Sequence, residues 1–69
     1  MYECTVTKEY AGKILLDFIL HMGREKEFEW DSNSLFVSLD DKLIAQGNIQ
    51  KTLVREGQIV KVFSLPAGG

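Results

Sequence analysis

The sequence predicts an α+β domain in which one helix packs across a mixed β-sheet, and three observations predict it. The chain has 69 residues, the size of a single domain with one thin core. Its apolar residues recur at helical spacing in one early segment and alternate with polar residues in later ones. No internal repeat and no linker rich in Pro, Gly or Ser divides it. We therefore expect one domain over residues 1–65 and a flexible tail over 66–69.

The first third of the chain predicts a strand followed by the helix. Residues 3–7 alternate weakly and are rich in residue types that favour strands. Between residues 12 and 22 the apolar positions follow one helical face, and Gly23 stands where a C-terminal helix cap is expected. The face consists of Ile14, Leu15, Phe18, Ile19 and Met22.

The rest of the chain predicts a hairpin and a final strand. Phe28 and Trp30 alternate with glutamates, which makes a short edge strand conceivable there. Residues 35–39 and 43–45 form two extended patterns on either side of Asp40-Asp41, as in a hairpin. Residues 55–58 read as a turn with a glycine, and residues 59–65 are the strongest strand pattern in the chain.

The last strand has apolar residues on both faces. Val60 and Val62 share one face, whereas Ile59, Phe63 and Leu65 share the other face with Lys61; Phe36 is the expected neighbour of this second group. One interpretation is a central strand whose second face neighbouring side chains cover. The other is an exposed apolar patch of Phe63, Leu65 and Phe36 that docks a partner.

Composition excludes several classes of protein. A single cysteine, Cys4, forms no disulfide within the chain, and Cys4 with His21 cannot supply the four ligands of a structural zinc site. The formal net charge is -2 and the basic residues do not cluster, which argues against nucleic acid as a partner. The sequence has no secretory signal and no apolar run that could span a membrane. We expect a cytoplasmic protein with no metal site and no catalytic residue.

The C-terminal residues suit a chemical role better than a structural one. Pro66 cannot continue a strand, and Gly68 and Gly69 have no side chains to pack. A carboxylate is a poor electrophile, so a C-terminus that carries a group must first become an acyl-adenylate inside another enzyme. Glycine removes steric bulk beside the reacting carbonyl, and Pro66 and Ala67 would then contribute to docking beside Phe63 and Leu65.

Three segments of the sequence resemble the small ubiquitin-like sulfur carriers of thiamine and molybdopterin biosynthesis. They are Leu35-Phe36-Val37-Ser38-Leu39-Asp40-Asp41-Lys42, the stretch from Thr52 to Val62, and the terminal Pro66-Ala67-Gly68-Gly69. The resemblance implies a β-grasp fold. It also implies a carrier that binds no cofactor and supplies no catalytic acid or base, with the Gly69 carboxylate as its reactive group.

The resemblance further implies a cycle with three partners. A ubiquitin-activating-type adenylyltransferase uses ATP to adenylate Gly69, a persulfide enzyme or sulfide displaces AMP, and a downstream synthase takes the sulfur from the resulting thiocarboxylate. A thiamine-type pathway is favoured, with molybdopterin or another sulfur metabolite left open.

The N-terminal part departs from the family pattern. Those carriers begin with a two-stranded hairpin, whereas the residues before Gly12 suffice for one strand. Either residues 26–30 supply the missing pairing, or two chains complete each other's sheets in a homodimer.

Two other functions remain open at this point. Tyr10-Ala11-Gly12-Lys13, Leu16-Asp17-Phe18-Ile19 and residues 54–60 also resemble the small RNA-binding domain shared by a ribosomal protein and pseudouridine synthases. That domain needs a second, basic helix, where this chain has the acidic residues 25–29. A ubiquitin-like modifier that is attached to lysines would share the chemistry of the carrier as far as the adenylate.

Overall fold

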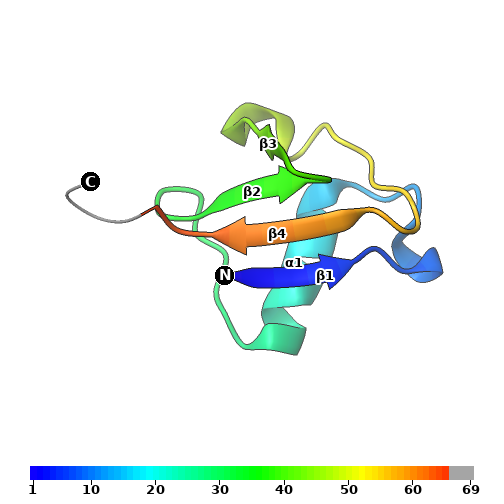
Figure 1. Cartoon of the computed structure of the whole chain (residues 1–69), viewed down its shortest axis with the longest axis horizontal. Coiled ribbons are helices and arrows are strands. Elements are labelled where there is room, and N and C mark those ends of the chain that lie inside the picture. The colour runs from blue at the N-terminus through cyan, green and yellow to red at the C-terminus, as the bar shows by residue number, and fades with distance from the viewer. Residues whose placement is uncertain (66–69) are drawn as a thin grey trace.

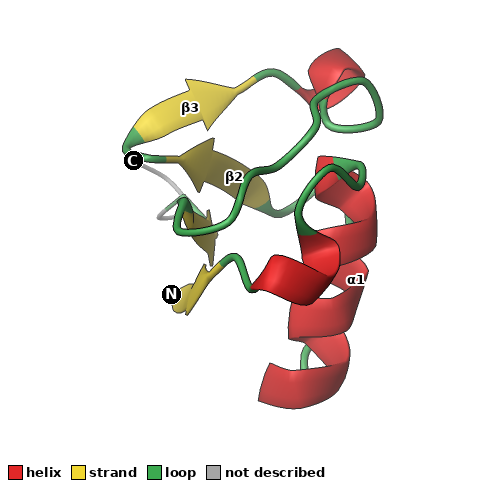
Figure 2. Ribbon diagram, turned by 90° about the vertical axis from the view of Figure 1, so that its right-hand side faces the viewer, coloured by secondary structure: helices red, strands yellow, loops and turns green. Residues whose placement is uncertain are grey.

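The computed structural model of the chain, described here for residues 1–65, has one α-helix lying across one face of a four-stranded sheet (Figure 1). The sheet and the helix form two layers, and the second face of the sheet is left open by these residues (Figure 2). The strands and the α-helix are β1 (Tyr2–Thr5), α1 (Leu15–Lys26), β2 (Phe36–Leu39), β3 (Lys42–Ile44) and β4 (Ile59–Phe63). Two short 3-10 helices span Lys8–Tyr10 and Gln46–Asn48.

The strands lie in the order β1-β4-β2-β3, and every neighbouring pair is antiparallel. The α+β class is thus confirmed, but the expected mixed sheet is wrong. A mixed sheet needs at least one parallel pair, whereas β1, the strand before α1, runs antiparallel to β4 and the other two pairs are antiparallel as well. The predicted hairpin is confirmed as β2 and β3, and Asp40 and Asp41 between them both have positive φ.

The helix begins and ends later than the sequence predicts. It starts at Leu15 and continues to Lys26, and Glu27 in the left-handed conformation ends it with an N–H donated to the Gly23 carbonyl. The predicted cap at Gly23 is therefore wrong, because Gly23 lies inside the helix. The lack of a side chain at Gly23 allows the backbone of Phe28 to pass close to the helix, because a Cβ at Gly23 would lie 2.7 Å from the carbonyl oxygen of Phe28.

The core lies between α1 and the helix-facing side of the sheet. The predicted apolar face of the helix supplies four buried side chains, and alternate residues of the central strands supply the opposite layer. The buried apolar residues are Val6, Leu15, Phe18, Ile19, Met22, Val37, Leu39, Ile49, Val54, Val60 and Val62. The predicted helical face is confirmed except at Ile14, which is 37% exposed and precedes the helix.

The segment that follows the helix does not form the expected edge strand. Residues 28–31 are irregular, so they do not supply a further strand beside β1. Instead the ring of Phe28 stacks on Tyr2, with 4.3 Å between the ring centroids. The alternation of Phe28 and Trp30 thus reflects a loop that returns apolar side chains to the domain. Within residues 1–65, no helix has both the length and the apolar character needed to cross a membrane.

Candidate functional site

The open face of the sheet is the candidate site, and the pleat of β4 determines which side chains reach it. Val60 and Val62 point toward the helix and are fully buried, whereas Ile59, Lys61 and Phe63 alternate with them and are partly exposed. The predicted division of the last strand between two faces is confirmed. The side chains that β4 contributes to this face therefore come from its odd-numbered positions.

Strand register brings further residues beside these positions. Phe36 on β2 lies opposite Phe63, and their rings are 6.3 Å apart between centroids at an interplanar angle of 29°. In the next row across the sheet, Glu3, Lys61, Ser38 and Leu43 are successive cross-strand neighbours. The sheet thus carries an aromatic pair at one end and a mixed row beside it.

Five apolar side chains gather around these two rows in one shallow hollow. We call them the open-face patch: Met1, Phe36, Leu43, Phe63 and Leu65. Three of them are largely solvent-exposed, with fractional exposures of 83% for Met1, 62% for Leu43 and 60% for Leu65. Single exposed apolar residues are common on protein surfaces, whereas a contiguous group of them is typical of a protein-binding surface.

One ion pair borders the open-face patch. The Nζ atom of Lys61 donates a hydrogen bond to Oδ1 of Asp41 at 2.9 Å, with side-chain exposures of 29% and 83%. This hydrogen bond, together with the charges of Asp41 and Glu3, raises the pKa of Lys61 above its ordinary value. Lys61 therefore stays charged over the physiological range, and the patch combines apolar contact with a fixed ion pair.

The structure places three of the predicted site residues together and does not describe the others. Phe36, Phe63 and Leu65 all line the same hollow. Pro66, Ala67, Gly68 and Gly69 lie outside the described residues. Sequence reasoning missed Met1 and Leu43. Met1 is two residues before Glu3 and so shares its face of β1, and Leu43 faces Ser38 across the hairpin that the sequence did predict.

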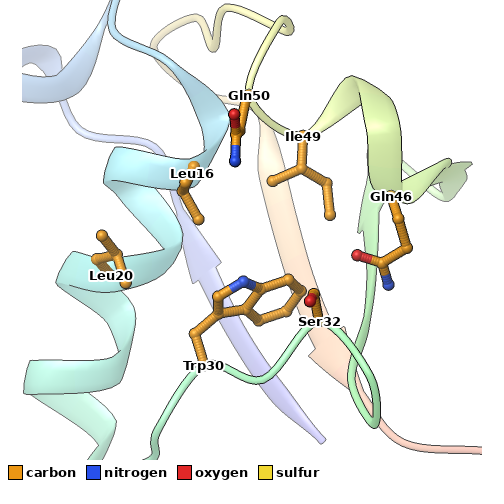
Figure 3. Close-up of a pocket in the computed structure, with 7 residues that line it drawn as sticks. All are labelled: Leu16, Leu20, Trp30, Ser32, Gln46, Ile49 and Gln50. Carbon is orange, nitrogen blue, oxygen red and sulfur yellow. The ribbon is translucent and has the colours of Figure 1, made fainter.

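A second hollow lies on the helix side of the molecule (Figure 3). Residues of α1, the α1–β2 loop, the second 3-10 helix and the turn after it line this hollow: Leu16, Leu20, Trp30, Ser32, Gln46, Ile49 and Gln50. No charged side chain is among them, and the side-chain amide of Gln46 is used to hydrogen-bond the carbonyl of Leu35 at 3.0 Å. This hollow offers packing but no reactive group.

The remaining chemically active side chains are dispersed. Over residues 1–65 no three His, Cys, Asp or Glu side chains come together in a way that could hold a metal ion. Cys4 is a free, partly buried thiol on β1. His21 stacks on Tyr10, with 4.6 Å between ring centroids.

Comparison with protein-family models, with curated proteins and with solved structures found no match to this chain.

Proposed function

We propose that this chain is a sulfur carrier of the β-grasp type, whose Gly69 carboxylate is converted to a thiocarboxylate that donates sulfur in a biosynthetic pathway. The observation that carries the proposal is the open-face patch, because it lies at the end of β4 from which the chain continues into Pro66 and the two glycines. A partner that binds the patch would hold the folded body close to the reacting carboxylate.

The β-grasp assignment is supported by the order of the later elements. A single helix crosses one face of the sheet, the β2–β3 hairpin follows it, and β4 returns to the middle of the sheet. β1 is the part of the sheet that departs from the family pattern, because one strand antiparallel to β4 lies where those carriers have a two-stranded hairpin. This departure lies at the outer edge of the sheet.

In the proposed cycle the chemistry belongs to the partners. The Gly69 carboxylate attacks the α-phosphate of ATP in an adenylyltransferase, which forms an acyl-adenylate and releases pyrophosphate. Sulfide, or a persulfide followed by reduction with a thiol, then displaces AMP and leaves the thiocarboxylate. Glycine at both terminal positions keeps the reacting carbonyl accessible. Docking supplies the positioning that makes attack effectively intramolecular.

The proposal is tested by the mass of the intact chain. The purified protein is incubated with ATP, sulfide and each ubiquitin-activating-type adenylyltransferase of the source organism. We expect one of these enzymes to replace one oxygen atom by sulfur, and the change to disappear in a control chain that lacks Gly69. An unchanged mass with every such enzyme would refute the carrier function, and attachment to protein lysines in place of sulfur would assign the chain to the modifiers.

A further inference from the structure

We infer that β1 pairs edge to edge with β1 of a second copy of this chain, antiparallel and centred on Cys4, so that the two sheets join into one. β1 is an outer strand with β4 on its inner side, and in Figure 1 it forms one edge of the sheet. Residues 28–31, where a strand was expected to pair with it, are irregular. The inference concerns self-association and does not depend on the sulfur chemistry.

The backbone groups of Glu3 and Thr5 point outward from this edge. The N–H and the carbonyl of Val6 are both hydrogen-bonded to the turn that precedes β4, at 2.8 and 2.9 Å. Because these groups alternate along a strand, Cys4 also directs its own toward β4, whereas Glu3 and Thr5 direct theirs away from it. Within residues 1–65 no backbone group outside the sheet bonds to them. This edge therefore presents donors and acceptors that a further strand can pair.

β1 also lacks the features that commonly protect an edge strand. Protected edges are very short, or carry lysine, proline or a bulge. β1 has four residues in unbroken register with β4, and none of them is lysine or proline. The opposite outer strand, β3, has three residues, begins with Lys42 and directs only the backbone groups of Leu43 outward. The edge open to pairing is therefore that of β1.

Hydrogen bonding and charge select one register for a second β1. Outward groups must meet outward groups, so odd-numbered positions of the two strands face each other. Pairing centred on Glu3 would set two glutamates directly opposite, which is unfavourable, and pairing centred on Thr5 would shorten the overlap. Pairing centred on Cys4 sets Glu3 opposite Thr5 in both directions and uses all of residues 2–6, the stretch that pairs with β4 and the turn before it. The two-fold axis is thereby fixed, perpendicular to the sheet and between the two Cys4 residues.

The helix-facing side of β1 is incompletely covered in a single chain. Tyr2 and Cys4 pack against the core but remain partly exposed, whereas Val62 and Val60, their neighbours on β4, are fully buried. The perpendicular axis keeps both helices on the same side of the joined sheet. In the dimer the two Cys4 side chains therefore lie next to each other and cover each other's exposed sides.

The open-face side of β1 carries one charge, and this register accommodates it. Each Glu3 stands beside Lys61 of its own chain, which offsets its charge. The two Glu3 residues of the dimer lie on a diagonal, so neither directly faces a like charge. An edge contact is small, and it predicts a weak dimer with a dissociation constant on the order of 100 µM.

Opposite substitutions at one position test the register. Thr5 is exposed, so neither Thr5→Lys nor Thr5→Glu disturbs the core. Because Thr5 lies opposite Glu3 of the second copy, Thr5→Lys should tighten the association about threefold and Thr5→Glu should weaken it about threefold. Each variant is the matched control of the other. Sedimentation equilibrium of the whole chain between about 10 µM and about 1 mM measures both dissociation constants.

A cross-link tests the axis. The two Cys4 residues form a non-hydrogen-bonded pair with Cα atoms about 4.5 Å apart, a separation that a disulfide can span. Diamide takes one hydrogen from each thiol and is reduced to the hydrazine, so it should trap the dimer through one S–S bond. Thr5→Glu should slow this trapping and Thr5→Lys should speed it.

Three results would overturn the inference. They are a chain that remains monomeric at about 1 mM, shifts of the same sign in Thr5→Lys and Thr5→Glu, and a dimer that diamide does not trap. The first result would leave the edge of β1 to a strand of another protein. Since Thr5 lies outside the open-face patch, the mass assay for sulfur transfer is independent of all three.

Discussion

At the scale of single residues, Gly23 illustrates how a side chain that is absent can shape the fold. The chain that leaves α1 passes so close that a Cβ at Gly23 would meet the carbonyl oxygen of Phe28 at 2.7 Å. The same pair is joined by a hydrogen bond from the Phe28 N–H to the Gly23 carbonyl at 3.0 Å. Through this turn the ring of Phe28 reaches Tyr2 on β1, so Gly23 links the end of the helix to the first strand.

This close approach predicts the effect of Gly23→Ala. Alanine normally stabilises a helix interior by about 1 kcal/mol relative to glycine. Here the added methyl group displaces backbone, so we expect the free energy of unfolding to fall by about 1–2 kcal/mol instead. Urea unfolding measures this change. Gly47→Ala is the matched control, because a Cβ added at Gly47 would meet no atom within 4 Å, and a stabilised Gly23→Ala protein would contradict the account.

At the scale of elements, α1 and the central strands supply most of the core. Phe18 is 1% exposed and is among the largest fully buried side chains, while Leu20 on the same helix is 43% exposed. The helix therefore packs through one face only, as its apolar spacing predicts.

This packing predicts that Phe18→Ala destabilises the protein far more than Leu20→Ala. Removing a buried phenyl ring costs about 3–5 kcal/mol, which is comparable to the whole stability of a domain of this size, about 3–5 kcal/mol. We expect Phe18→Ala to lose most of its thermal unfolding transition by circular dichroism. Leu20→Ala should stay within about 1 kcal/mol of the parent; equal effects would mean that the helix is packed differently.

The elements also show what periodicity could and could not predict. The alternation of residues 35–39 and 59–63, with turn residues between the hairpin strands, correctly indicated β2, β3 and β4. The end of α1 could not be predicted from the neighbouring sequence. Gly23 is needed because the backbone of Phe28 passes close to it, and the residue that ends the helix in the left-handed conformation is Glu27. The prediction of an edge strand at residues 28–30 was wrong for a related reason. Phe28 packs against Tyr2, which is distant in sequence, and no local pattern indicates this contact.

At the scale of the whole molecule, the domain presents one covered and one open sheet face. The pleat of β4 allowed Phe63 and Leu65 to be assigned to the open face from sequence, and Phe36 followed from the hairpin. Met1 could not be assigned because its position depends on β1 lying beside β4, which no local pattern encodes. Leu43 was missed although it faces Ser38 across the predicted hairpin. The carrier proposal depends both on the open-face patch and on the terminal glycines Gly68 and Gly69.

The most direct test of the carrier function is the state of Gly69 in the source organism. Cells are harvested into an alkylating reagent that traps thiocarboxylates, and the intact protein is then weighed and fragmented. We predict a fraction of chains that end at Gly69 and bear the alkylated sulfur on that residue. A mature chain that continues past Gly69, or a terminal carboxylate without any trapped sulfur, would contradict the account.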